Sequence, residues 1–186
     1  MYQTSDIRKG LKIEMDGAPW IVVGFQFVKP GKGQAFTRTK LKNLLTGAVV
    51  DRTYKSGEAL QPADVEEKSM QYLYTDGELY HFMDTGDFSQ VGIPEENLGD
   101  AGKWMVEEME VTVLFYKGRP VSVDVPNFVE LEITYCEPGV RGNTATGATK
   151  PATLSTDAVV NVPLFVEQGT VIKIDTRTGE YVGRVS

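Results

Sequence analysis

Glycine-containing turn pairs between β-rich segments constrain the fold of this 186-residue chain more than any other feature. Such pairs are the strongest short-range signal for a β-hairpin, because the favoured hairpin turns need residues that tolerate positive φ. Five pairs occur: Asp16-Gly17, Thr46-Gly47, Asp76-Gly77, Lys117-Gly118 and Thr178-Gly179. The sequence therefore predicts a series of hairpins.

The segments between these turns have the pattern of strands. Polar and apolar residues alternate over 109–116 and again over 170–175, which is typical of strands with one buried face. No segment carries an amphipathic helical stripe of useful length, and the best helix candidates are the short stretches 94–97 and 101–104. Many short strands at regular spacing favour sandwiches or small barrels, so we predict an all-β protein.

Two breaks divide the predicted strands into three sets. The polar stretch 56–64 separates the first set from the second. Val125-Pro126-Asn127 separates the second from the third, since proline is confined to strand ends and edges. Each piece has about 60 residues, a size at which many β-barrels fold alone, though marginally. We predict three small β-barrels in series, over 1–64, 65–126 and 127–186.

The composition bounds the class of protein. The apolar content of 41% is ordinary for a packed core, and no apolar run approaches the roughly 20 residues that span a bilayer. The N-terminal residues lack the basic and apolar regions of a secretory signal. The single cysteine, Cys136, excludes an internal disulfide and a cysteine-based metal cage, and we expect it to be buried and inert. We expect a soluble, cytoplasmic protein with no membrane partner.

The net charge of −7 is unevenly distributed along the chain. Residues 1–64 hold 10 Lys and Arg against 6 Asp and Glu, whereas residues 65–126 hold 4 against 13. A protein that meets bare nucleic acid over its whole surface should be basic throughout, because phosphate neutralisation drives that affinity. One interpretation is an N-terminal part that touches RNA and an acidic middle that faces solvent or a basic protein. The alternative is a charge fluctuation without function.

Residues for enzyme chemistry are nearly absent from the sequence. The one histidine, His81, lies in a strand-like run and has the usual pattern of a structural histidine. No phosphate loop, nucleophile elbow or His-Glu-x-x-His motif occurs. We therefore predict no catalytic residue, no metal site and no cofactor, and a function in binding.

The run from Lys29 to Phe36 forms the tip of one predicted hairpin. Pro30-Gly31 suits the centre of a type II turn, since proline presets φ and glycine takes positive φ. Gly33, before Gln34, permits a second turn, so Lys32 stands at an apex with no neighbouring side chain to bury it. Such a cation fits a crevice that a bulkier loop could not enter. The alternative is a lysine that only keeps a hairpin edge soluble.

A second candidate site is the long segment 137–151, which is rich in glycine and threonine. Long loops in compact domains are usually functional or mobile. Freed backbone amides, threonine hydroxyls, Arg141 and Lys150 are donors suited to a phosphodiester backbone. A surface loop without a ligand is the alternative.

The chain resembles the bacterial elongation factor P family along its full length. The likeness is carried by the run from Lys29 to Phe36, then by 40–47, 70–74, 127–131, 149–154, 162–165 and 172–181. The resemblance implies an SH3-like (KOW-type) barrel followed by two OB-folds, arranged in an L like a tRNA. It also implies a monomer that binds the 70S ribosome between the P and E sites and stimulates peptide bond formation at consecutive prolines.

The resemblance further implies roles for particular residues. Lys32 would reach the CCA end of peptidyl-tRNA and position it. In many members a modifying enzyme extends this lysine; the Pro-Gly-Lys-Gly-Gln context resembles the β-lysylated branch, while other branches carry a different adduct or none. The triplet Gly142-Asn143-Thr144 would lie near the E-site mRNA, although many members have aspartate where this chain has Asn143. Tyr181 and Arg184 match positions near tRNA, and a packed strand end is their alternative.

Two rival interpretations stay open, beside a purely structural role that only the general acidity of the chain supports. One is a specialised paralogue of the same shape, although such proteins usually depart from the Pro-Gly-Lys-Gly tip. The other is a general single-stranded RNA-binding OB-fold protein, which would need aromatic stacking platforms in a positive groove. The acidity of residues 65–126 argues against that groove in the middle domain and does not exclude one in the third.

Overall fold

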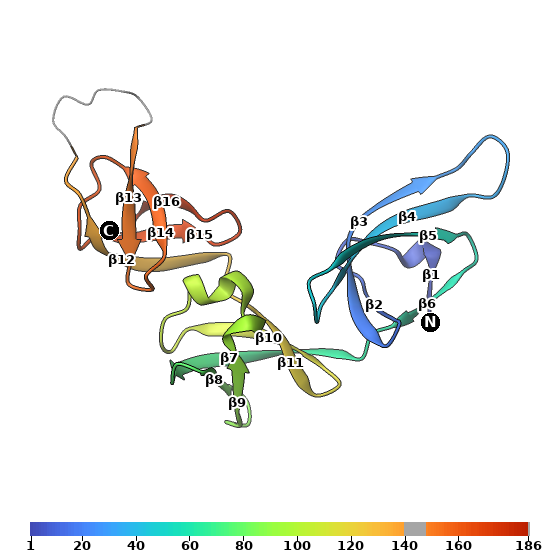
Figure 1. Cartoon of the computed structure of the whole chain (residues 1–186), viewed down its shortest axis with the longest axis horizontal. Helices are drawn as coiled ribbons and strands as arrows, with labels where there is room; N and C mark the ends of the chain where they lie inside the picture. The colour runs from blue at the N-terminus through green and yellow to red at the C-terminus, as the bar shows by residue number, and fades with distance from the viewer. Residues whose placement is uncertain (140–147, 186) are drawn as a thin grey trace. The chain divides into compact units, whose positions relative to one another are not determined.

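The computed structural model describes residues 1–139 and 148–185. Within these ranges the chain forms sixteen strands and three short 3-10 helices, which confirms the all-β prediction (Figure 1). The two predicted helical stretches are the 3-10 helices η2 (Glu95–Asn97) and η3 (Gly99–Lys103). The strands belong to three sheets, of six, five and five strands.

The first sheet has the strand order β1-β6-β2-β3-β4-β5. Its strands are β1 (Tyr2–Gln3), β2 (Lys12–Met15), β3 (Ala18–Val28), β4 (Phe36–Asn43), β5 (Val49–Lys55) and β6 (Ala59–Pro62), with the 3-10 helix η1 (Thr4–Asp6) after β1. Its core contains Ile7, Ile13, Trp20, Val22, Leu41, Tyr54 and Leu60. Burial raises the pKa of the Tyr54 hydroxyl.

One predicted break between strand sets is wrong in part. The polar stretch 56–64 contains β6, which pairs with β1 and β2 and so completes the first sheet. Leu60 is buried and lies opposite Tyr2, and this single apolar side chain anchors the short strand. A strand of four residues with one buried side chain shows no detectable alternation, which explains why the sequence pattern missed it.

The second and third sheets contain the remaining strands. The second has the order β11-β10-β7-β8-β9 and consists of β7 (Val65–Thr75), β8 (Leu79–Asp84), β9 (Gln90–Pro94), β10 (Glu110–Tyr116) and β11 (Arg119–Asp124). The third has the order β14-β13-β12-β15-β16 and consists of β12 (Phe128–Cys136), β13 (Thr149–Leu154), β14 (Val159–Pro163), β15 (Val171–Asp175) and β16 (Glu180–Arg184). The predicted break at 125–127 lies between β11 and β12.

All five predicted turn pairs lie between consecutive strands. At Asp16-Gly17 both residues have positive φ, 53° and 74°, and at Lys117-Gly118 the values are 49° and 81°. Positive φ at both central residues defines the type I′ turn, whose twist matches that of the flanking strands. These two hairpins therefore follow the rule from which the fold class was predicted.

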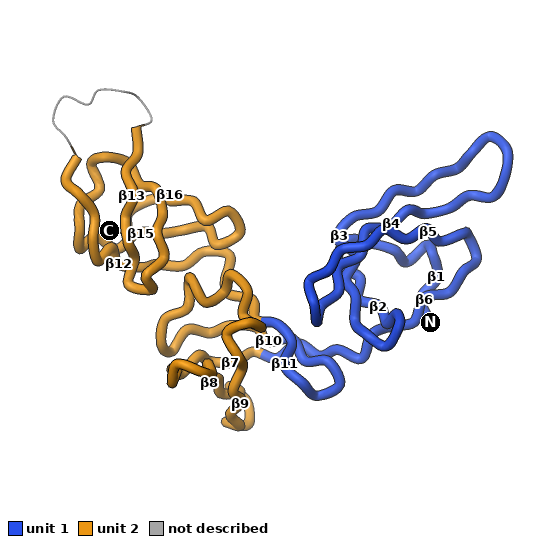
Figure 2. The backbone as a smooth tube through the Cα atoms, in the orientation of Figure 1, with its two compact units in different colours: residues 1–68, 114–122 blue, residues 69–113, 123–186 orange. Residues whose placement is uncertain are grey.

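The chain packs as two compact units (Figure 2). The first contains residues 1–68 and 114–122, and the second contains 69–113 and 123–186. Within the first unit, the hydroxyl of Tyr116 donates to Glu14 Oε1 at 2.5 Å, and this hydrogen bond raises the pKa of Tyr116. Leu114 and Val121 pack beside it, next to Leu44. The division into three barrels at 64/65 and 126/127 stays a prediction.

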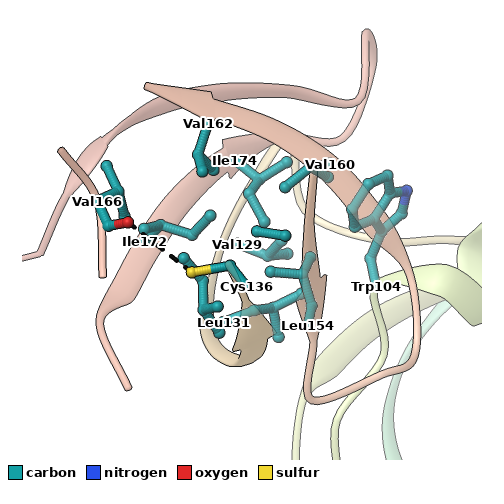
Figure 3. Close-up of a cluster of buried hydrophobic side chains, with 12 residues drawn as sticks. Trp104, Val129, Leu131, Cys136, Leu154, Val160, Val162, Val166, Ile172 and Ile174 are labelled. Atoms are coloured by element: carbon teal, nitrogen blue, oxygen red, sulfur yellow. Dashed lines mark hydrogen bonds between the residues drawn. The ribbon is translucent and has the colours of Figure 1, made fainter. Parts of the chain in front are cut away.

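The core of the second unit has its largest cluster in the third sheet (Figure 3). Leu131, Leu154, Ile172 and Ile174 are fully or nearly fully buried there. Trp104, which follows η3, packs into the same cluster and so ties the helical segment to this sheet. Cys136 is a free, buried cysteine whose Sγ lies 3.8 Å from the carbonyl oxygen of Val166, which confirms its predicted burial.

Candidate functional site

The predicted hairpin around Lys32 is formed by β3 and β4. The two strands pair antiparallel from Trp20 opposite Asn43 to Val28 opposite Phe36, and β5 pairs along the other side of β4. Residues 29–35 form the connecting loop, which lies at the far end of this hairpin from the body of the first sheet (Figure 1). The strands therefore carry the loop outward on hydrogen-bonded backbone.

A β-bulge at Val23 sets which side chains face outward near the loop. The register shifts between Val22 and Gly24, so one extra residue lies on β3. Val22 is buried opposite Leu41, but beyond the bulge Phe25 and Phe27 are exposed on the same face of the hairpin. A bulge leaves two residues opposite one and resets the alternation of faces.

The opposite face of β4 is cationic. Arg38, Lys40 and Lys42 are all exposed, and they alternate along the strand with buried side chains. On this face, Lys55 of β5 lies opposite Phe36. Asp51, also of β5, lies opposite Lys40 and places one acidic side chain among these cations. Because side chains on alternate residues share a face, the strand concentrates positive charge beside the loop. This is the surface type that attracts phosphate.

Among the described residues, two hydrogen bonds attach the loop to the rest of the sheet, both on its β4 side. The backbone N–H of Ser56 donates to Ala35 O at 3.0 Å, and the Gln34 amide Nε2 donates to Ser56 O at 2.7 Å. Both bonds hold the β4 side of the loop against the turn after β5. Gln34 therefore has a structural contact in addition to its place at the tip.

One detail of the predicted loop geometry is wrong. Gly31 does not have positive φ, so Pro30-Gly31 does not form the type II turn expected from the sequence. Gly33 carries the left-handed conformation instead, with φ of 102°. The turn residue is therefore displaced by two positions along the loop, and Gly31 contributes open space without a conformational requirement.

Lys32 is exposed between these glycines, as predicted. A Cβ atom added at Gly31 or Gly33 would have no heavy atom within 4 Å, so the flanks of the lysine are bare. Within the described part of the chain, Lys32 makes no hydrogen bond, ion pair or ring contact. An extended ammonium without internal partners is free to contact a group outside the protein.

The predicted sites of the third sheet have mixed outcomes. Arg141, Gly142, Asn143 and Thr144 lie outside the described residues. Lys150 is only 8% exposed, and its Nζ donates to Glu137 O at 2.7 Å. This hydrogen bond gives Lys150 a structural role, and the burial of its side chain leaves little of it accessible to RNA.

The two predicted residues of the last strand differ in their surroundings. Tyr181 is half-buried and packs against the core of the third sheet. Arg184 is exposed, and its Cζ lies 5.1 Å from the ring centroid of Phe165. Of the two, Arg184 is the one available to an external ligand.

His81 has a structural environment. Its Nε2 lies 2.9 Å from Asp76 Oδ2, and its ring stacks on Tyr74 at 4.6 Å between centroids. The hydrogen bond from His81, followed by those from the backbone of Leu79 and Glu78, holds the pKa of Asp76 well below its usual range. These contacts fit a histidine that serves the fold.

In the described ranges, no three His, Cys, Asp or Glu side chains come together in a way that could hold a metal ion. No helix among the described residues is long and apolar enough to cross a membrane. The sequence prediction overlooked one feature of the third sheet, a groove with the exposed rings of Tyr135 and Phe165. Strong exposure of two aromatic side chains is a property of the folded chain and has no signal in the sequence pattern.

Three protein-family models match consecutive parts of the chain. They are described as the elongation factor P KOW-like domain, matching residues 3–60, the elongation factor P OB domain, matching 65–123, and elongation factor P, C-terminal, matching 129–184. These three domains, matched in this order over nearly the whole chain, are those of a translation elongation factor. Such a factor is ribosome-associated and is not an enzyme.

Similar proteins identify the family. The chain is 56% identical to elongation factor P of Clostridium botulinum (strain Eklund 17B / Type B) and 55% identical to that of Caldanaerobacter subterraneus subsp. tengcongensis, over 100% of both chains in each case. The chain belongs to the elongation factor P family, as its resemblance implied. The family works without a cofactor.

Solved structures show the same fold at low identity. The eukaryotic translation initiation factor 5A from Methanococcus jannaschii superposes with a TM-score of 0.54 at 18% identity, over 64% of this chain and 88% of that chain. A family protein of the same kind from Naegleria fowleri gives 0.50, also at 18% identity, over 67% of this chain and 96% of that chain. At this identity the likeness concerns the fold alone.

Proposed function

We propose that this factor binds the 70S ribosome between the P and E sites and stimulates peptide bond formation at consecutive prolines. Lys32 contacts the acceptor end of peptidyl-tRNA and positions it for reaction. The observation that carries this proposal is the exposure of Lys32, an ammonium with no partner among the described residues, at the end of a hydrogen-bonded hairpin. Membership of the elongation factor P family supports it.

The physical basis of the proposal is positioning. Proline is a constrained reactant because its ring fixes φ. Ribosomal RNA supplies the chemistry, so a factor without catalytic groups helps by ordering the reactants, which lowers a barrier by several kcal/mol in the manner of effective-molarity effects. An ammonium is the wrong form for proton abstraction unless it is strongly desolvated, and Lys32 is exposed.

The cationic face of β4 also supports a hairpin that points its loop toward the acceptor end of the tRNA. Arg38, Lys40 and Lys42 lie along the strand that leads from the sheet to the loop. A tRNA acceptor end is lined by phosphates, and positively charged side chains fix the register of a protein on such a backbone. On this proposal the strand contacts phosphates while the loop reaches the terminal nucleotides.

The remaining parts of the proposal concern partners. The factor acts in the cytoplasm as a monomer, with three domains over 1–64, 65–126 and 127–186. A lysine-modifying enzyme extends Lys32 with a β-lysyl-type or other group. Arg141 to Thr144, with Arg184, face RNA at the other end of the chain, including the E-site mRNA. The exposure of Arg184 supports its part in this contact.

The test is reconstituted translation of a template with a run of proline codons, using protein from its native host. Lys32→Ala should reduce stall relief to the level without factor, while its free energy of unfolding stays within about 0.5 kcal/mol of wild type, as for other exposed substitutions. Lys9→Ala removes an exposed cation elsewhere in the first unit and is the matched control, with full activity expected. The intact mass of the same sample identifies any adduct on Lys32.

Two outcomes would contradict the proposal. Full stall relief by Lys32→Ala would remove the positioning role of the lysine. No stall relief by the wild-type protein, together with tight, salt-sensitive binding to free RNA, would favour a general single-stranded RNA-binding protein.

A further inference from the structure

The third sheet carries a groove of 770 Å³ at one end of β12. We call it the aromatic groove and define it by five of its lining residues: Tyr135, Glu137, Phe165, Glu167 and Gln168. Its size lies within the roughly 300–1,000 Å³ of pockets that hold one small ligand. The described residues that line it all belong to the second unit, whereas the Lys32 loop belongs to the first.

Two exposed aromatic rings line this groove from distant parts of the sequence. Tyr135, near the end of β12, is 57% exposed, and Phe165, just after β14, is 62% exposed. A register shift between Ile133 and Tyr135 in the β12–β13 pairing accompanies the outward position of the tyrosine. Solvent contact of two large rings at one groove is unfavourable in the free protein and favours a ligand that covers them.

One face of the Phe165 ring already has a partner. The guanidinium carbon of exposed Arg184 lies 5.1 Å from its centroid, a cation–π contact. An aromatic ring has two faces, so the high exposure of Phe165 leaves the other available for stacking. Arginine on one side of the ring orients it and adds a cation at the groove's edge.

The walls of the groove are held in place without a ligand. Lys150 Nζ donates to Glu137 O at 2.7 Å, which ties the end of the β12 wall to β13. Cys136 Sγ lies 3.8 Å from Val166 O, which ties this wall to the segment after β14 (Figure 3). Gly139 approaches Leu164 so closely that a Cβ atom would lie 2.5 Å from its carbonyl oxygen. A preformed groove loses little conformational freedom when it binds.

We propose that the aromatic groove binds a single unpaired nucleobase of RNA, stacked on Phe165 and Tyr135. Glu137 and Glu167 accept hydrogen bonds from amino groups on the edge of the base. This assignment rests on the proposed function, because a ribosome-bound factor meets single-stranded RNA, and it adds a base-reading site in the second unit.

The chemistry of the groove favours a base over its competitors. Every nucleobase has a π-face that stacks on aromatic rings, and arginine reinforces such stacking. Carboxylates repel phosphate but accept from the amino groups of cytosine, adenine and guanine, which uracil lacks. A proline-rich peptide also docks on aromatic grooves, but proline has no N–H to donate to Glu137 or Glu167.

The experiment is a titration of the full chain with single-stranded trinucleotides, followed by NMR signals of the Tyr135 and Phe165 rings. The cytidine trinucleotide should shift both signals below about 10 mM and bind several-fold more tightly than the uridine trinucleotide. Phe165→Leu should weaken binding about tenfold, since one stacked base accounts for a loss of this order. Phe88→Leu, at another highly exposed phenylalanine of the same unit, is the matched control.

The outcomes separate this proposal from the proposed function. Unshifted ring signals, unchanged binding in Phe165→Leu, or tighter binding of a proline oligopeptide than of the trinucleotide would overturn the base-binding site. Lys32→Ala should bind the trinucleotide like wild type. If wild type fails at proline codons but still binds the trinucleotide through Phe165, the proposed function falls and the site stands.

Discussion

The β3–β4 loop and the β7–β8 turn both end a hairpin, but they differ in the hydrogen bonds that their polar side chains make. In the β7–β8 turn, Asp76 accepts from the backbone of Glu78 and Leu79 at 2.9 and 2.8 Å and contacts His81 at 2.9 Å. Thr75 Oγ1 donates to Leu79 O at 3.0 Å. In the β3–β4 loop, Lys32 makes no such contact with any residue that the structure describes.

This difference separates side chains that hold a turn together from those that are available to a partner. A carboxylate that accepts several hydrogen bonds within its own turn fixes the backbone and has little capacity for a ligand. Lys32, an exposed cation between two glycines, holds no part of the described chain in place. Substitutions in the two hairpins should therefore have opposite effects on stability and on activity, beginning with the Lys32→Ala loss of stall relief.

The next largest effect should come from the left-handed residue of the β3–β4 loop. Gly33→Val places a β-branched residue at φ of 102°, which costs of order 1–3 kcal/mol or forces the loop into another conformation. If the active loop conformation is disfavoured by that amount, stall relief should fall about tenfold in reconstituted translation.

Gly31→Val is the matched control in the same loop, because Gly31 has no positive φ and open space around it. Its stall relief should stay within about twofold of wild type. Equal loss in both variants would mean that bulk beside Lys32, and not backbone conformation, limits activity.

A loss of stability without loss of activity is expected in the β7–β8 turn. Asp76→Ala removes the contacts to Glu78, Leu79 and His81, so the urea midpoint of unfolding should fall while stall relief is retained. Glu78→Ala, at an exposed acid in the same turn, should leave the midpoint unchanged. Impaired stall relief in a folded Asp76→Ala protein would break the comparison between the two hairpins.

The same substitution has a defined pH dependence. The pKa of Asp76 is lowered in the folded protein, so its ionised form stabilises the fold above the unfolded pKa of about 3.9. This contribution is lost as pH falls through the folded pKa. The difference in unfolding midpoint between wild type and Asp76→Ala should therefore be full at neutral pH and shrink in acid. A constant difference would contradict this assignment.

The smallest effect should come from the Gln34–Ser56 hydrogen bond, the tether that holds the β4 side of the β3–β4 loop. Gln34→Leu removes the 2.7 Å hydrogen bond to Ser56 O, which is exposed and contributes about 0.5 kcal/mol. Stall relief should fall about twofold. Gln61→Leu, at an exposed glutamine of β6, should have no effect, and an equal loss there would show that the tether is irrelevant.

The hairpins and the exposed lysine were predictable because they depend on local chemistry. Asp16-Gly17 and Lys117-Gly118 form type I′ turns, and such turns are encoded in two residues. The exposure of Lys32 follows from its glycine neighbours. In contrast, the roles of Gly31 and Gly33 depend on how β5 and Ser56 hold one end of the loop.

Long-range pairing explains what the sequence did not predict. Residues 59–62 form strand β6 because they pair with β1 and β2. The sequence of 59–62 alone does not indicate this pairing. Lys150 has a cationic side chain suited to phosphate, yet the fold buries it against Glu137 O. The aromatic groove combines residues about thirty positions apart. Each of these features depends on tertiary contacts that local patterns do not contain.

The bulge at Val23 has a consequence for how the hairpin tolerates changes in length. Loss or gain of one residue between the bulge and the loop would shift every later side chain of β3 to the opposite face. Phe25 and Phe27 would then exchange sides with Gln26 and Val28. Changes by two residues would preserve the faces and alter only the reach of Lys32. Insertions and deletions in the β3–β4 hairpin beyond the bulge should therefore be tolerated when they change its length by two residues and not when they change it by one.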